Sequence, residues 1–234
     1  MGDRYHRVRI EIDPTHPCFT KALGPGFRRD ERSFELTVAI IGYGAGNTAS
    51  VQFALERLGT RSVITDDPAV IAEAERVILP GVGAAGYAMA RLTALGLIDP
   101  LRAFTRPLLG VCLGQQLLFE HSDEGEGAAL LGFIPGAVTR LDVRPDLPVP
   151  HMGWTRLHGL KEDPLLEGVT TGDYAYFVHG YVCPDTPFTL ACADYGTEVP
   201  AVVRAGNRWG CQVHPERSAT AGARILENFL SLPC

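Results

Sequence analysis

The sequence has no long apolar run and no excess of positive charge, and both absences narrow what the chain can do. No segment approaches the roughly 18 apolar residues that a membrane-spanning helix needs. The first residues, MGDRYHRVRIEID, contain no apolar core of the secretory type, so we expect no signal peptide and a cytoplasmic protein. The formal net charge of −6 argues against a nucleic-acid binder held by phosphate neutralisation.

The chain also lacks the cysteine spacing of a metal site or a disulfide framework. Its six cysteines include no C-x-x-C pair. A glycine-rich run, Gly42-Tyr43-Gly44-Ala45-Gly46, is similar to a dinucleotide fingerprint, but Asn47 stands where the third glycine is needed. A tight strand-to-helix turn explains the run better. We therefore expect no metal and no cofactor.

Two parts of different character follow one another along the chain. Residues 1–35 mix charges, prolines and glycines without a sustained period, so we expect an extension that is disordered, loosely docked, or produced by a start codon assigned too far upstream. Residues 36–234 form the expected domain. Its expected strands are 36–41, 61–65, 76–79, 108–111, 137–141, 174–182, 188–193, 199–204 and 209–213, and its expected helices are 47–58, 68–74, 84–95, 113–119 and 218–230.

This order of elements predicts the fold class. Strands alternate with helices up to about residue 119, which indicates βαβ units and a parallel sheet covered on both faces. The later strands follow one another more directly, with a hairpin turn at Gly206-Asn207. We expect an α/β domain with a mostly parallel central sheet, helices on both faces and an added mixed or antiparallel layer of strands. Ser218 is available as the N-cap of the last helix.

The residues around Cys112 are the most informative about function. The stretch PLLGVCLGQQLLFE puts Cys112 between a buried strand and an amphipathic helix, with Gly110 and Gly114 two residues away on each side. Small flanking residues are needed at a sharp strand-to-helix turn, which is the arrangement of a nucleophile elbow. The helix N-terminus there favours the thiolate. A buried structural cysteine is the alternative.

A cysteine nucleophile needs a base and an orienting acid. His214 lies where the strand 209–213 ends, and Glu216 lies on the same side if the segment stays extended. A strand-end histidine held by a nearby acid is the structural alternative.

The oxyanion formed during attack also needs donors. One is the backbone N–H of Leu113. A second can come from Gly81, Val82 and Gly83, where two glycines let the backbone turn an N–H inward or flip between two states.

Together these residues resemble a class I (triad-type) glutamine amidotransferase. More narrowly, the chain resembles the glutaminase subunits of imidazole glycerol phosphate synthase, from histidine biosynthesis. GVCLG and HPE specify only the superfamily, whereas PGVG, PHMGW and YFVHGY point to the histidine branch. The resemblance covers about Thr37 to the C-terminus, through the motifs VAIIGYGAGN, LPGVGAAGYAM, GVCLGQQLLFE, EGEG, LGFIPGAV, VPHMGW, YFVHGY and QVHPERS.

The resemblance implies a flavodoxin-like glutaminase fold and assigns roles to residues. It makes Cys112, His214 and Glu216 the triad that hydrolyses glutamine to glutamate and ammonia. The remaining roles are implied in the same way: Gln116 and Glu124 hold the polar groups of glutamine, His179, Gly180 and Tyr181 contact its carboxylate, Gly81, Val82 and Gly83 supply an oxyanion donor, and Asn47, His151, Met152 and Trp154 face a partner.

In the family the partner is a (βα)8-barrel cyclase, and the two chains form a heterodimer. Ammonia passes to a ribulosyl ribonucleotide, and the products are imidazole glycerol phosphate and aminoimidazole carboxamide ribonucleotide. Three positions depart from the family pattern, and those at Gly42 and Gly180 bear more on partner and acceptor than on glutamine hydrolysis. Members usually have Asp at Gly42, Met at Gln115 and Ser at Gly180.

Three other functions remain open. The glutaminase could supply another synthase, for sugar amidination or pyridoxal phosphate synthesis. The chain could instead be a non-catalytic regulatory subunit, against which the intact triad argues. A cysteine peptidase is the third, although the Gln116 and Glu124 pocket suits a single amino acid better.

Overall fold

The computed structural model of the chain describes residues 38–142, 144 and 147–234. The predicted extension, residues 1–35, lies outside the described residues, as do the first two residues of the strand expected at 36–41. Within the described ranges, no helix is long and apolar enough to cross a membrane.

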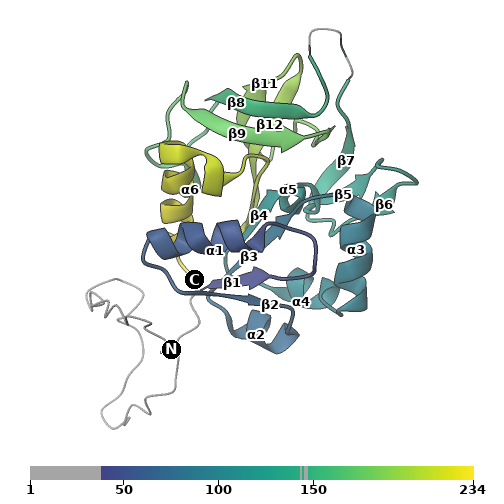
Figure 1. Cartoon of the computed structure of the whole chain (residues 1–234), viewed down its shortest axis with the longest axis vertical. Coiled ribbons are helices and arrows are strands. Elements are labelled where there is room, and N and C mark those ends of the chain that lie inside the picture. The colour runs from purple at the N-terminus through teal and green to yellow at the C-terminus, as the bar shows by residue number, and fades with distance from the viewer. Residues whose placement is uncertain (1–37, 143, 145–146) are drawn as a thin grey trace, which may run out of the picture. The chain divides into compact units, whose positions relative to one another are not determined.

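A nine-stranded sheet has the order β2-β1-β3-β4-β13-β12-β11-β8-β9 (Figure 1). From β2 to β13 neighbouring strands are parallel, and from β13 to β9 they are antiparallel. The sheet confirms the predicted α/β fold, and its antiparallel strands continue the parallel ones. The strands are β1 (Val38–Ile41), β2 (Ser62–Thr65), β3 (Arg76–Gly81), β4 (Leu108–Cys112), β8 (His151–His158), β9 (Tyr174–His179), β11 (Thr189–Asp194), β12 (Glu198–Ala205) and β13 (Arg208–Cys211).

Helices cover both faces of the parallel strands, as expected. The side chains of β1 alternate between two apolar clusters, because successive residues of a strand point to opposite faces. Val38 and Ile40 pack with α1 and α6, whereas Ala39 and Ile41 pack with α2, α3 and α4. The helices are α1 (Thr48–Arg57), α2 (Pro68–Glu73), α3 (Ala85–Ala94), α4 (Ile98–Ala103), α5 (Leu113–Gln116) and α6 (Ala219–Ser231), with two short 3-10 turns, η2 (Pro164–Leu166) and η3 (Pro215–Arg217).

A separate four-stranded sheet, in the order β10-β7-β5-β6, forms the added mixed layer. The helix predicted over 113–119 is wrong in its second half, because α5 ends at Gln116. Beyond α5, the carbonyls of Leu117 and Leu118 accept hydrogen bonds from Leu131 and Phe133 instead of from the next helical turn. The strands of this sheet are β5 (Phe119–Ser122), β6 (Ala128–Ala129), β7 (Ile134–Arg140) and β10 (Tyr181–Val182).

The strand predicted over 174–182 is divided at Gly180. Its first part, β9, pairs with β8 in the large sheet, and its second part, β10, pairs with β7 in the small one. The Gly180 carbonyl accepts from the backbone N–H of Leu141, 2.9 Å away. Gly180 is therefore the point at which the chain leaves one sheet for the other.

In the C-terminal part, the predicted hairpin turn is confirmed, and the predicted side-chain cap of the last helix is wrong. Gly206-Asn207 joins β12 to β13 as a hairpin, with Ala205 opposite Arg208. Ser218 does stand at the N-cap position of α6, but its hydroxyl makes no capping bond. It donates to the His214 carbonyl instead, and it accepts from the backbone N–H of Tyr176. Ser218 thus holds the segment that carries the predicted base.

Candidate active site

Cys112 stands at a strained turn between β4 and α5. Its φ is +55°, which a residue other than glycine rarely adopts. The predicted reason for the flanking glycines is confirmed. A Cβ at Gly110 would overlap the Gly114 carbonyl oxygen, and one at Gly114 would overlap the Leu79 carbonyl oxygen. Backbone close to backbone therefore fixes the sulfur at this turn.

His214 is brought beside Cys112 by the segment that follows β13. Its backbone N–H donates to the Tyr176 carbonyl at 2.9 Å. The expectation of an extended segment was wrong, because Pro215–Arg217 forms a 3-10 turn. That turn still brings Glu216 back to the imidazole, and Nδ1 of His214 lies 2.9 Å from Oε1 of Glu216. Both side chains are buried.

The surroundings of His214 favour its charged form. Burial lowers the pKa of His214, but its interactions with Cys112 and Glu216 outweigh burial and raise the pKa to about 10. Because Glu216 occupies Nδ1, Nε2 is the nitrogen left for the sulfur and for a reacting group. This Nε2 is buried and has no hydrogen-bond partner among the described residues. The site can hold an imidazolium beside the Cys112 sulfur.

A pocket of about 460 Å³ opens in front of Cys112. This volume lies within the range of roughly 300–1,000 Å³ that is usual for small-molecule sites. It brings together most of the predicted site residues from β4, α5 and the ends of β9 and β10. The pocket is lined by Val82, Gly83, Ala84, Cys112, Leu113, Gln116, Glu124, Pro150, Val178, His179, Gly180 and Tyr181.

Gln116 and Glu124 present acceptor oxygens to this pocket. The side-chain nitrogen of Gln116 donates to the Tyr181 carbonyl at 3.1 Å, which leaves its oxygen available. One oxygen of Glu124 accepts from the backbone N–H of Ala85 at 2.7 Å, at the start of α3. The other Glu124 oxygen is free of this bond, so the two side chains suit a ligand with an ammonium group.

His179 is buried, and a chain of hydrogen bonds fixes which of its ring nitrogens carries the proton. The Tyr181 carbonyl can only accept, so Nδ1 of His179, 2.8 Å away, carries the proton. Nε2 of His179 then accepts from Nδ1 of His151 at 3.0 Å, and Nε2 of His151 accepts from the Thr155 hydroxyl at 2.7 Å. Burial lowers the pKa of His179 to about 4 and, together with His179, that of His151 to about 3. Burial therefore keeps this pocket wall uncharged, and the hydrogen bonds orient the two imidazole rings.

The predicted oxyanion residues divide into two groups. Val82 and Gly83 line the pocket, and Gly83 has a φ of +92°, which suits a turning peptide. Gly81, by contrast, is the last residue of β3 and is not part of the pocket lining. A Cβ on Gly81 would come within 2.5 Å of the Tyr43 hydroxyl oxygen, so Gly81 is small for packing reasons.

Three of the four residues expected to face a partner are exposed. Met152 is 63% exposed and Trp154 is 49% exposed, and both lie on β8 at the antiparallel end of the sheet. Asn47 is exposed and caps α1 through its side-chain oxygen. His151 is only 1% exposed, because its ring stacks between Phe177 and Tyr195. It cannot contact a partner directly.

The three positions at which the chain departs from the family pattern, Gly42, Gln115 and Gly180, lie in different environments. A Cβ at Gly42 would lie 2.8 Å from Cγ2 of Ile64, so a larger residue needs that side chain to move. Gln115 is fully buried, and it donates to the Pro200 carbonyl at 2.9 Å. Gly180 lines the pocket, and a Cβ there would make an ordinary 3.6 Å contact with Val149.

Sequence reasoning missed two residues beside Cys112, Gln212 and Tyr43. Gln212 is fully buried and donates to the Cys112 sulfur at 3.7 Å. No local pattern indicated its position, because β13 ends at Cys211 and the chain bends at Gln212 and Val213. Tyr43 is also fully buried, and its hydroxyl has no partner among the described residues. Nothing in the glycine-rich run around Tyr43 indicated that it reaches the site.

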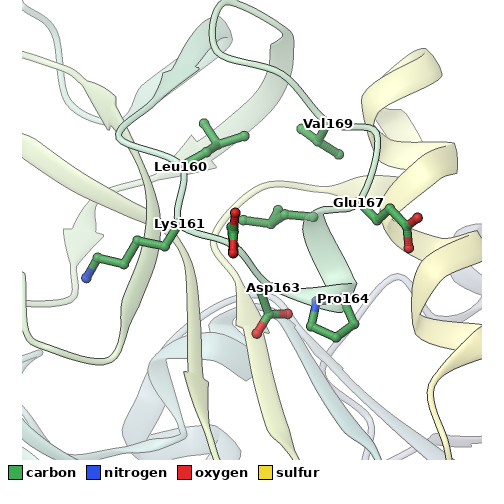
Figure 2. Close-up of a pocket in the computed structure, with 8 residues that line it drawn as sticks. Leu160, Lys161, Asp163, Pro164, Glu167 and Val169 are labelled. Carbon is green, nitrogen blue, oxygen red and sulfur yellow. The ribbon is translucent and has the colours of Figure 1, made fainter.

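A second hollow, of about 570 Å³, lies around η2 and is lined by none of the predicted site residues (Figure 2). Its buried carboxylate is Asp163, which accepts from Trp209 at 3.0 Å and from Arg204 at 2.7 Å. The backbone N–H of Leu165 also donates to it, at 2.8 Å. Asp163 is therefore occupied in joining η2 to β12 and β13.

The fold and the pocket in front of Cys112 together define an α/β domain with a cysteine at an elbow beside a histidine and a carboxylate. The family described as glutamine amidotransferase class-I matches residues 39–232. Imidazole glycerol phosphate synthase subunit HisH of Xanthomonas euvesicatoria pv. vesicatoria (strain 85-10) is 52% identical over 195 residues, which cover 83% of this chain and 97% of that protein. The HisH protein of Xylella fastidiosa (strain Temecula1 / ATCC 700964) is also 52% identical, with the same coverage. The chain belongs to the class I glutamine amidotransferases and, within them, to the HisH subunits of imidazole glycerol phosphate synthase.

Solved structures agree on the fold. A crystal structure of a glutamine amidotransferase superposes with a TM-score of 0.65 at 20% identity, covering 83% of this chain and 98% of that one. The structure of PurLQS from Thermotoga maritima superposes with a TM-score of 0.59 at 21% identity, covering 84% of this chain and 98% of that one.

Proposed function

We propose that this chain is the glutaminase subunit of an imidazole glycerol phosphate synthase and that Cys112, His214 and Glu216 are its catalytic triad. The observation that carries the proposal is the position of Cys112. Its sulfur lies at an elbow, beside an imidazole held by a carboxylate 2.9 Å away, and opens on a pocket of about 460 Å³. This arrangement supports acyl transfer through a covalent intermediate.

In the first half-reaction, the Cys112 thiolate attacks the side-chain carbonyl carbon of glutamine. A sulfur–carbon bond forms, and the carbon–nitrogen bond breaks as His214 gives its Nε2 proton to the leaving nitrogen. Ammonia departs and a glutamyl thioester remains. The negative charge on the carbonyl oxygen is stabilised by the N–H of Leu113 and by an N–H from Val82 or Gly83.

In the second half-reaction, His214 takes a proton from water, and the oxygen attacks the thioester carbon. The sulfur–carbon bond breaks, glutamate leaves, and the thiolate–imidazolium pair is restored. Glu216 keeps the imidazole oriented and stabilises its charge in both halves.

The same pocket suits glutamine as the ligand. The free oxygens of Gln116 and Glu124 would accept from the α-ammonium group. The segment His179-Gly180-Tyr181 would hold the α-carboxylate of glutamine through its backbone. The imidazole of His179 is neutral, so this segment adds no charged side chain to the pocket.

We propose a (βα)8-barrel cyclase as the partner in a heterodimer that uses the ammonia. The exposed side chains of Met152 and Trp154 form an apolar pair on β8, and Asn47 lies exposed at the start of α1. These residues form the proposed partner face. Tryptophan is enriched among the residues that carry most of the binding energy near the centre of an interface.

The first prediction tests this function directly. Glutamate release should be low for the purified chain and should rise when the cyclase and the ribulosyl ribonucleotide are added. Cys112→Ala should lower the activity of the complex by at least about a thousandfold, because the acyl intermediate cannot form. Unchanged low release under all conditions would count against the histidine-pathway function. Unchanged release by Cys112→Ala in the complex would instead show that the chain is not the catalytic glutaminase.

A further inference from the structure

We propose that Gln212 is a further catalytic residue of this site, whose side-chain amide donates a hydrogen bond to the Cys112 sulfur and stabilises the thiolate. The inference rests on the proposed role of Cys112 as the nucleophile. Gln212 lies between β13 and His214, its side chain is fully buried, and its Nε2 is 3.7 Å from Sγ of Cys112.

The orientation of the Gln212 amide follows from a chain of hydrogen bonds that begins at Tyr181. A carbonyl oxygen can only accept, so the group of Gln116 that lies 3.1 Å from the Tyr181 carbonyl must be its NH2. The same nitrogen lies 3.0 Å from the side-chain oxygen of Gln212 and donates its second hydrogen there. The oxygen of Gln212 is thereby occupied, and its NH2 must point the other way.

The far end of this chain is the sulfur. The NH2 group of Gln212 can only donate, so Cys112 accepts. The Tyr181 carbonyl is itself fixed, because it also accepts from Nδ1 of His179 at 2.8 Å. An amide of known polarity is therefore delivered to the nucleophile without any freedom to flip.

This donor favours the thiolate over the thiol. As a thiol, Cys112 can donate its S–H to the Val178 carbonyl, 3.7 Å from Sγ. Loss of the proton removes that bond and leaves the carbonyl oxygen facing an anion. The bond from Gln212, in contrast, strengthens when the sulfur becomes charged, because a charge-assisted hydrogen bond is about twice as strong as a neutral one.

The same donor acts in both half-reactions. It supports the attacking thiolate, and it supports the thiolate again as the leaving group when water cleaves the thioester. His214 transfers protons in both half-reactions, whereas Gln212 only donates a hydrogen bond to the sulfur. Gln212 thus stabilises a charge that His214 creates and removes.

The test measures the pH dependence of Cys112 alkylation by iodoacetamide, followed by mass spectrometry of the Cys112 peptide. We compare the wild-type chain with Gln212→Met, which keeps the size and loses the donor, and with the isosteric Gln212→Glu, which places an acceptor against the sulfur. The pH of half-maximal reactivity should rise by about one unit in Gln212→Met, and by more in Gln212→Glu. Gln115→Met is the matched control, because it removes a neighbouring buried amide that does not contact the sulfur, and its profile should match the wild type.

The outcomes separate this role from packing and from the proposed function. A folded Gln212→Met or Gln212→Glu with the wild-type pH profile would overturn the proposal, even if glutamine turnover fell. If neither variant folds, Gln116→Met breaks the chain one step earlier, and the same upward shift is expected because the Gln212 amide is released. An unshifted profile in a folded Gln116→Met would then overturn the proposal. If Cys112 of the wild-type chain reacts with iodoacetamide no faster than glutathione at any pH, Cys112 is not an activated nucleophile. That result would contradict the proposed function as well as the role of Gln212.

Discussion

The parallel and antiparallel halves of the large sheet contribute to the site in different ways. In the parallel half, backbone packed against backbone fixes Cys112, since neither Gly110 nor Gly114 has room for a Cβ. In the antiparallel half, β9 contributes Val178 and His179 to the pocket wall, and His179 hydrogen-bonds to His151 of the neighbouring strand β8. The position of Cys112 therefore depends on steric fit, whereas the orientation of His151 and His179 depends on which of their ring nitrogens carry protons.

This difference predicts opposite sensitivities. The parallel half should fail when a single methyl group is added at the elbow and should respond little to pH. The antiparallel half should accept added volume at the pocket edge but lose stability in acid.

The largest expected effect is Gly114→Ala. Its Cβ would overlap the carbonyl oxygen of Leu79 in the adjacent strand, and that backbone cannot move without disturbing β3. We expect the free energy of unfolding to fall by at least about 4 kcal/mol. Chemical denaturation followed by circular dichroism measures it.

Gly86→Ala is the matched control for this prediction. Gly86 lies inside α3, where a Cβ would make only an ordinary 3.9 Å contact with Ala128. It should stabilise the chain by about 0.5–1 kcal/mol, because alanine is the better helix former. A Gly114→Ala chain as stable as Gly86→Ala would show that the elbow can relax.

The same division explains how much could be predicted from the sequence. Buried strands and helices of the parallel half have local apolar patterns, so β1 to β4 and α1 to α3 were found, and the Cys112 elbow was found from two glycines. The strand β8 was missed because its pairing partner, β9, lies about 20 residues further along the chain. The break at Gly180 was missed because only long-range pairing with β7 ends β9 there.

The candidate site could be predicted in part for the same reason. Cys112, His214 and Glu216 follow from residue type and spacing at two strand ends. Gln212 and the His151–His179 contact depend on which side chains meet inside the fold, and no local pattern shows this. The buried position of His151 could not be separated from the exposed positions of Met152 and Trp154 without the alternation of β8.

The next effect is an acid-dependent loss of stability carried by the antiparallel half. In the fold the pKa values of His151 and His179 are about 3 and 4, whereas an unfolded histidine titrates near 6.5. Unfolding therefore takes up protons below about pH 6.5, and the free energy of unfolding falls as the pH drops from there toward 4. Between pH 7 and pH 5 we expect a loss of about 2 kcal/mol for each histidine. Urea denaturation at several pH values measures it.

His151→Phe separates the two histidines. Phenylalanine can occupy the space between Phe177 and Tyr195, and it removes one titrating group, so the acid-dependent loss should fall by about half. Trp154→Phe, a change on the same strand without a titrating group, should keep the full loss. If the unfolding free energy of His151→Phe falls by as much as that of the wild type between pH 7 and pH 5, His151 and His179 are not the source of the loss.

The smallest expected effect lies where the two sheets meet, at Gly180. A Cβ there meets only Val149 at 3.6 Å, and the φ of Gly180 is outside the left-handed range, so Gly180→Ser should fit. Serine restricts the unfolded chain more than glycine does, and the unfolding free energy should rise by up to about 1 kcal/mol.

Gly136→Ser is the contrasting control, because Gly136 has a φ of +117° and a Cβ there would lie 2.8 Å from Pro184. It should destabilise the chain by more than about 1 kcal/mol. If Gly180→Ser is tolerated, glycine at this pocket edge is not a requirement of the fold, and any change in the KM for glutamine then reports on the hydroxyl added to the substrate pocket. If it is as damaging as Gly136→Ser, the junction between β9 and β10 is sterically fixed like the elbow, and the pocket edge does not share the tolerance expected of the antiparallel half.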